Sequence, residues 1–276
     1  MTINYHAIAD AAFVRLRELM GVGDRYCGAD GHRRAQELLR LWSAIADSVR
    51  EQMFVEMFFG KAVNCLNLWT RFGGERDGRI MLVSHYDTRP WADRDPRDDR
   101  APVPGANDGG SGVVLLAELM QHFKANRNRP SVDIVFLDAE DWHDIDGKNV
   151  SIGARHFVAA LTEPPDACLE IDMVAGRNLM LDVNVSCQEH DASYALTLQL
   201  FQLGRALKLP AFDLAKPHPY KWIDCDHMAF MRAGIPSALL MDLDYREWHT
   251  RADTIEACDP ESLAQIAEVV LTWIYS

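Results

Sequence analysis

Apolar residues recur at helical spacing in two early segments, residues 8–20 and 35–49, with Asp30 as a candidate cap before the second. The pattern then changes to a period of two in residues 52–59 and again in residues 63–72, which end at the turn-rich sequence GGERDG. Alternation of this kind is typical of strands with one buried face. The first quarter of the chain therefore predicts two helices followed by a pair of strands at a sheet edge.

The remainder alternates short, continuously apolar strands with helices. We expect strands at residues 80–84, 132–137, 169–173 and 237–241, and helices at residues 111–123, 152–161, 193–207 and 260–275. Apolar strands separated by helices are typical of a largely parallel sheet covered on both faces. No repeat or low-complexity linker interrupts the pattern. The sequence predicts one α/β domain over residues 1–276, a three-layer α/β/α sandwich with a mixed, largely parallel central sheet.

Composition narrows the class of protein. Apolar residues make up 48% and charged residues 25% of the 276 residues, which excludes a disordered chain and a disulfide-stapled miniprotein. The net charge of −13 disfavours nucleic-acid and anionic-membrane partners, because both require a basic face. There is no apolar run of about 18 residues and no signal-peptide pattern. The six cysteines form no CxxC pair, so we expect a cytoplasmic protein with reduced thiols.

Acidic and imidazole side chains gather after the predicted strands. They are His85 and Asp87, the run Asp138-Ala139-Glu140-Asp141, Asp172, and His249, with Asp108 before the helix that follows GANDGGSG. Taken singly, such a histidine is ordinarily a surface residue, and an aspartate before a helix is ordinarily an N-cap. In open α/β sheets, however, ligands bind beyond the carboxyl ends of the strands. Several such residues at strand ends of one polarity indicate a functional site.

The residue types indicate metal chemistry. Carboxylates and imidazoles without thiolates suit a catalytic zinc ion that keeps an open coordination position. Neighbouring side chains on extended backbone point apart. Of the pair Glu140-Asp141, one residue can therefore bind the metal while the other faces the substrate as a base.

Six motifs, in this order, resemble the zinc aminopeptidase superfamily and, more narrowly, its bacterial glutaminyl-peptide cyclotransferase branch: HYDTRPWADRDP, GANDGGSG, FLDAEDW, IDMVAG, CDHMAFMRAGIP and EWHTRADT. The resemblance extends from about residue 27 to the end of the chain. The HxD, GAND and paired-acid motifs are shared by the superfamily. The sequence HYDTRPWAD, the DAED form and the tryptophan before the last histidine are the more cyclase-like features.

The resemblance implies a role for each matching residue. It makes Asp108, Asp141 and His249 the ligands of one zinc ion and Glu140 the catalytic acid/base. It also places Asp172 and Asp226 in the catalytic acidic network, and Trp248 and Trp142 in the substrate pocket. In the aminopeptidase pattern, His85 and Asp172 would bind a second zinc ion, with Asp108 bridging the two ions. Asp87 would then orient His85.

Two activities fit these residues. A glutaminyl cyclase converts an N-terminal glutaminyl group to pyroglutamyl and releases ammonia, as an acyltransferase that uses zinc to polarise the amide carbonyl. The alternative is a metalloaminopeptidase with one or two zincs that hydrolyses N-terminal residues or a small amino-acid amide. A binding protein that kept the fold and lost turnover is a third possibility. The expected partner is a peptide N-terminus or a small molecule.

The sequence departs from the cyclase pattern in one region. Cys225 replaces an acid that usually precedes His227, and a half-buried inert thiol there is the simplest interpretation. The segment before it, residues 217–223, is bulky and contains Lys221 and Trp222, both expected at the pocket. The bulk of this segment and the positive charge of Lys221 predict a narrowed pocket, so the substrate is expected to be a small or acidic amino-acid derivative rather than a general peptide.

Overall fold

The structure is a computed structural model that describes residues 3–212 and 220–276. Its centre is a six-stranded sheet with the order β1-β2-β4-β3-β5-β8. The strands are β1 (Ser48–Phe58), β2 (Lys61–Phe72), β3 (Arg79–His85), β4 (Ser131–Leu137), β5 (Ala167–Ile171) and β8 (Ser237–Leu240). Strands β4, β3, β5 and β8 are parallel, and the hairpin β1–β2 joins β4 in antiparallel pairing. The mixed, largely parallel sheet is confirmed.

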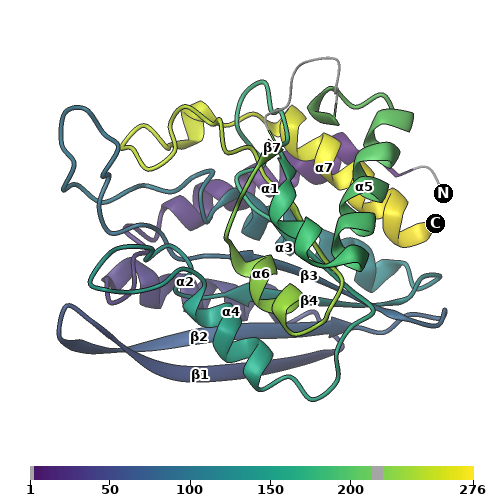
Figure 1. The fold of residues 1–276 in the computed structure, drawn as a ribbon, viewed down its shortest axis with the longest axis horizontal. Coiled ribbons are helices and arrows are strands. Elements are labelled where there is room, and N and C mark those ends of the chain that lie inside the picture. The colour runs from purple at the N-terminus through teal and green to yellow at the C-terminus, as the bar shows by residue number, and fades with distance from the viewer. Residues whose placement is uncertain (1–2, 213–219) are drawn as a thin grey trace.

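Helices cover both faces of this sheet (Figure 1). On one side lie α1 (Tyr5–Met20), α2 (Asp30–Ser43), α3 (Ser111–Ala125), α5 (Asp191–Ala206) and α7 (Pro260–Tyr275). On the other side α4 (Ile152–Ala159) packs against α6 (Asp226–Arg232). None of the helices in the described part of the chain is long and apolar enough to cross a membrane. The three-layer α/β/α architecture is confirmed.

The apolar runs in the parallel strands are continuous because both of their faces are buried. In β3, Leu82 packs into the core on the side of α3, whereas its neighbours Met81 and Val83 pack into the core on the side of α4 and α6. Successive side chains of a strand point to opposite faces, so a strand between two helical layers needs apolar residues at every position.

The edge hairpin begins earlier than expected. Periodicity predicts a helix over residues 35–49, but α2 ends at Ser43, and Val49 lies in β1 opposite Thr70. Pairing with β2 overrides the local helical pattern there. Asp30 is the first residue of α2 rather than its cap.

Three short elements have no counterpart in the predicted pattern: α6 and the two-stranded pair of β6 (Val183–Asn184) and β7 (Tyr220–Lys221). A helix of seven residues has less than two turns, and a strand of two residues has a single alternation, so neither leaves enough positions for a period to stand out. Helix α6 matters for the site, because it begins directly after Cys225.

Candidate active site

The three predicted zinc ligands, Asp108, Asp141 and His249, lie together beyond the carboxyl ends of the parallel strands. His249 Nε2 is 3.4 Å from Asp108 Oδ2 and 3.3 Å from Asp141 Oδ1. The buried oxygens Asp108 Oδ2 and Asp141 Oδ2 make no hydrogen bond with any described residue. One imidazole and two carboxylates with unused oxygens are the donor set of a three-ligand catalytic zinc site. The residues present therefore fit a zinc ion.

The Asp108 loop is held from two sides. The backbone N–H groups of Asn107 and Asp108 donate to the Asp253 carboxylate over 2.8 and 3.1 Å. Gly109 adopts a φ of +73°, and a Cβ there would lie 2.2 Å from the carbonyl oxygen of Asp87. Only glycine permits this approach. The sequence GANDGGSG thus supplies both the candidate ligand Asp108 and, at Gly109, the glycine that the loop geometry requires.

Asp87, in the motif HYDTRPWADRDP, is hydrogen-bonded to the backbone of the paired acids Glu140 and Asp141. Its carboxylate accepts hydrogen bonds from the backbone N–H of Glu140 (2.9 Å) and of Asp141 (3.3 Å). The expected role of orienting His85 falls mainly to the Asp87 carbonyl oxygen, which lies 3.1 Å from His85 Nδ1, whereas the carboxylate lies 3.6 Å away. Asp87 therefore positions the candidate base, Glu140, and the candidate metal ligand Asp141 through the main chain.

Two residues that the sequence did not single out orient His249. Its Nδ1 lies 3.4 Å from Asp93 Oδ1, and Arg89 Nε donates to Asp93 Oδ2 over 2.9 Å. Arg89 also lies 3.3 Å from Asp141. Outer partners of this kind fix the ring orientation of a histidine ligand. Both residues belong to HYDTRPWADRDP, so the motif contained the signal.

A second group of potential ligands shares Asp108. His85 Nε2 is 3.3 Å from Asp108 Oδ1 and 3.3 Å from Asp172 Oδ1. All three residues are buried, and burial raises the pKa of Asp172 to about 6. The arrangement is compatible with a second metal ion bridged by Asp108, so the ligand geometry alone does not separate a one-zinc from a two-zinc enzyme.

Glu140, the candidate base, precedes Asp141 in the chain and lines the same cavity as the candidate zinc ligands. It is 7% exposed, and burial raises the pKa of its carboxyl well above the usual range. The Cys225 thiol lies 3.4 Å from Glu140 Oε1 and 3.8 Å from Asp172 Oδ2. Cys225 thus occupies the place at the base where the resemblance expects an acid. Burial raises the pKa of this thiol well above its ordinary value, so it stays protonated.

The thiol proton points to a residue that sequence reasoning missed. Cys225 Sγ donates to Glu170 Oε1 over 2.8 Å. Glu170 also accepts from the backbone N–H of His227 (2.6 Å) and from its Nδ1 (3.0 Å). Burial opposes ionisation of Glu170, but the hydrogen bonds from His227 keep its pKa below the usual value. A glutamate within the apolar strand β5 is the sequence signal for this network.

These groups open into a cavity of about 520 Å³. Its wall combines the candidate ligands with Trp222, Trp248, Met241, Leu243 and Val150. Both tryptophans line the cavity: Trp222 is 56% exposed, and the centre of the Trp248 ring system lies 4.4 Å from the centre of the His249 ring.

Asp226 does not line this cavity, but it lies close to the acidic network: after burial, its charge helps to raise the pKa of Glu140. It is fully buried at the start of α6, and neither of its carboxyl oxygens makes a hydrogen bond within the described residues. Burial raises its pKa well above the usual range. Cys225 contacts Glu140 directly, whereas Asp226 acts on it through its charge, without a hydrogen bond from its carboxyl group to any described residue.

Two further predicted pocket residues lie elsewhere. Trp142 is fully buried 4.2 Å from the ring of Phe58, where it fills the space under the edge hairpin. Lys221 is absent from the cavity wall, because its Nζ pairs with Asp244 at 2.6 Å and with Asp182 at 3.3 Å. Residues 217–219 of the bulky segment lie outside the described residues.

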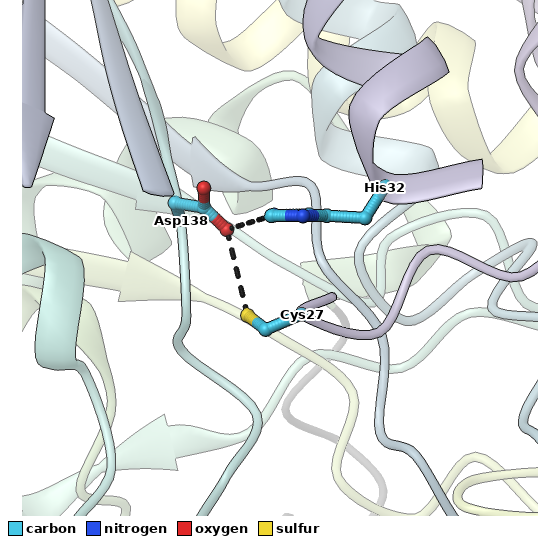
Figure 2. Close-up of side chains that lie close together, drawn as sticks. All are labelled: Cys27, His32 and Asp138. Atoms are coloured by element: carbon cyan, nitrogen blue, oxygen red, sulfur yellow. Dashed lines mark hydrogen bonds and ion pairs between the residues drawn. The ribbon is translucent and has the colours of Figure 1, made fainter. Parts of the chain in front are cut away.

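A separate buried cluster joins Cys27, His32 and Asp138 (Figure 2). His32 Nε2 lies 2.8 Å from Asp138 Oδ1, the distance of a direct hydrogen bond. Asp138 also accepts from the backbone N–H of Leu66 (2.7 Å) and from the Tyr86 hydroxyl. The carboxylate is saturated by hydrogen bonds, in contrast to the unused oxygens at the active site. Through these hydrogen bonds, Asp138 at the end of β4 connects the segment around Cys27 and His32 with strand β2 of the edge hairpin.

We expect Asp138→Asn to lower the free energy of unfolding by about 2–4 kcal/mol, because a buried charged hub loses its pairing with His32. Urea denaturation measures this loss. Asp99→Asn, the same change at an exposed aspartate, is the matched control and is expected to stay within about 0.5 kcal/mol of wild type. Equal stabilities of the two variants would contradict the hub role.

Comparison with known proteins places this site in a family. The model of Peptidase family M28 matches residues 67–274. Aminopeptidase YwaD of Bacillus subtilis is 26% identical over 209 residues, and the match covers 71% of this chain but only 40% of the aminopeptidase. The chain thus spans about two fifths of the length of that relative.

Solved structures of two kinds are similar over nearly the whole chain. Tannerella forsythia glutaminyl cyclase has a TM-score of 0.86 and 26% identity, covering 97% of this chain and 98% of its own. A Zn-dependent exopeptidase from Parabacteroides distasonis has a TM-score of 0.88 and 24% identity, covering 97% and 98%. The second likeness shows the fold alone. The family model covers most of the chain, including every candidate metal ligand, and the chain belongs to Peptidase family M28.

Proposed function

We propose that this protein is a zinc-dependent glutaminyl cyclase, which converts an N-terminal glutaminyl group to pyroglutamyl and releases ammonia. The observation that supports it most is the combination in one cavity of three zinc ligands, an adjacent buried glutamate and a tryptophan wall. The full-length similarity to Tannerella forsythia glutaminyl cyclase points in the same direction.

Asp108, Asp141 and His249 would hold the zinc ion. When bound, zinc polarises the side-chain amide carbonyl of the substrate glutamine. The cavity holds the glutamine folded, with its α-amine next to its own Cδ, and proximity then replaces a second reactant. Trp248 and Trp222 exclude water that would compete with the amine as a nucleophile.

Glu140 moves the proton. As the α-nitrogen bonds to Cδ, Glu140 Oε accepts the proton that this nitrogen loses. The bond between Cδ and the amide nitrogen then breaks, and Glu140 returns the proton to the departing nitrogen, which leaves as ammonia. Burial raises the pKa of this carboxyl, which strengthens the carboxylate as the base that takes the proton from the α-nitrogen.

A metalloaminopeptidase is the second candidate, and one observation favours it. His85, Asp108 and Asp172 form a complete second ligand group beside the first. In that enzyme Glu140 would deprotonate an attacking water molecule instead of an amine.

One experiment separates the two candidates. The zinc-loaded protein is incubated with the dipeptide amide Gln-Ala-NH2 and with an alanyl anilide. The cyclase proposal predicts that Gln-Ala-NH2 gives a product lighter than itself by the mass of one ammonia molecule, together with an equal amount of free ammonia. It predicts that no aniline is released from the alanyl anilide. Hydrolysis of the anilide without pyroglutamyl product would instead establish the peptidase.

A further inference from the structure

Among the described residues, one basic side chain at the cavity mouth has no acidic partner. Four basic residues line the cavity: Arg89, Arg94, His143 and His249. The other three contact carboxylates: Arg89 contacts Asp93 and Asp141, His143 contacts Asp144, and His249 contacts Asp108 and Asp141. Arg94 forms neither an ion pair nor a side-chain hydrogen bond with any other residue that the structure describes. Its guanidinium is exposed and free to bind a ligand.

Arg94 is nevertheless held in place. Its backbone N–H donates to the carbonyl oxygen of His249 over 3.2 Å, and its guanidinium carbon lies 4.3 Å from the centre of the Trp248 ring. A guanidinium stacked on an aromatic face keeps its N–H edges available, and these match a carboxylate in bidentate geometry. The stack therefore presents a preformed site for an anion.

The neighbouring acids do not neutralise this site. Asp224, the acidic residue beside Trp222 in the same wall, is paired with Arg232 at 3.4 Å. Asp93 is paired with Arg89. The remaining carboxylates of the cavity belong to the buried metal site and to its base. Among the described residues, Arg94 is therefore the basic side chain of the cavity wall whose charge no contacting carboxylate offsets, although the chain as a whole has a net charge of −13.

The position of Arg94 defines which part of a substrate would reach it. Trp248 lies 4.4 Å from the ring of His249, so the guanidinium is one aromatic ring away from a metal ligand. One residue of extended chain spans about 3.5 Å. The guanidinium therefore lies less than 9 Å from the His249 ring, a span that one extended residue and the carboxylate-bearing side chain or terminus of the next can cover.

We propose that Arg94, stacked on Trp248, binds a carboxylate carried by the second residue of the substrate. This inference rests on the proposed function, since it takes the N-terminal residue to react beside Glu140. The carboxylate has two possible sources: the side chain of an acidic second residue, or the free carboxyl terminus of a dipeptide.

Three peptides distinguish the sources: Gln-Glu-NH2 has only the side-chain carboxylate, Gln-Ala has only the terminal one, and Gln-Ala-NH2 has neither. We expect kcat/KM to be about tenfold higher for at least one carboxylate peptide than for the neutral peptide, the effect of about 1.4 kcal/mol. In Arg94→Ala this ratio falls to about one. The ratio cancels any effect of the substitution that is common to all three substrates.

Arg97→Ala is the matched control, because Arg97 is an exposed arginine of the same loop that does not line the cavity. It is expected to keep the wild-type ratio. No preference in the wild-type protein, or a preference that persists in Arg94→Ala, would overturn the proposed site.

Failure of the proposed function gives a different result. Pyroglutamyl formation from Gln-Ala-NH2 supports the cyclase whatever the preference. If none of the peptides reacts, their binding to wild type and to Arg94→Ala is compared by calorimetry. Tighter binding of a carboxylate peptide, lost in the variant, supports the site without the cyclase, and equal affinities overturn the site.

Discussion

Glu140→Gln is expected to lower kcat by about 10²–10⁴-fold while the protein keeps its zinc, because glutamine matches the shape of glutamate but cannot accept a proton. Glu140 lies beside the ligand Asp141, and its backbone N–H, not its side chain, is bound by Asp87. The substitution therefore leaves the contacts that organise the metal site. Ammonia release from Gln-Ala-NH2 measures kcat, and metal analysis of the dialysed protein measures zinc.

Glu163→Gln serves as the matched control, since Glu163 is an exposed glutamate far from the cavity wall. It is expected to turn over at the wild-type rate. Turnover by Glu140→Gln within a few-fold of wild type would remove Glu140 from the mechanism. Loss of zinc together with activity would show instead that Glu140 supports the ligands.

His249→Ala is expected to weaken zinc binding by more than about 100-fold, because the loss of an outer partner alone costs about 10–100-fold and this change removes a ligand. Activity should fall with zinc occupancy. The chelator concentration that removes half of the zinc measures the affinity, and the melting temperature with and without zinc measures the linked change in stability.

His6→Ala, a change at an exposed histidine of α1, is the control and should bind zinc as wild type does. The number of zinc ions left in His249→Ala adds a second readout. A protein that loses its only zinc has one site, whereas retention of one ion of two would place a second metal at His85. Unchanged affinity in His249→Ala would contradict the assigned ligand set.

The layered architecture could be predicted because burial sets a clear pattern. Strands between two helical layers must be apolar at every position, and the long helices repeat their apolar residues every three or four positions. Residues 260–275 were predicted as a helix with the same bounds as α7. Short elements such as α6 were missed, since seven residues contain less than two full periods.

The candidate site was predictable to the extent that its motifs are local. Asp108, Glu140, Asp141 and His249 lie in short segments whose loop geometry depends on neighbouring residues, and the structure brings them together. The positions of the Asp226, Lys221 and Trp142 side chains could not be predicted. Each depends on the direction in which the side chain leaves a helix start or a loop. That direction is set by packing partners distant in sequence, such as Phe58 for Trp142.

By itself the sequence determined the fold class, the residue types of a metal site and the cysteine at position 225, because composition, period and motif spacing are properties of neighbouring residues. Only the tertiary structure decided that Cys225 donates to Glu170, and that Lys221 pairs with Asp182 and Asp244. It also decided that Arg94 lies over Trp248 without an ion pair to any described residue. These are contacts between segments far apart in the chain. Their energies depend on distance and burial, which no local pattern records.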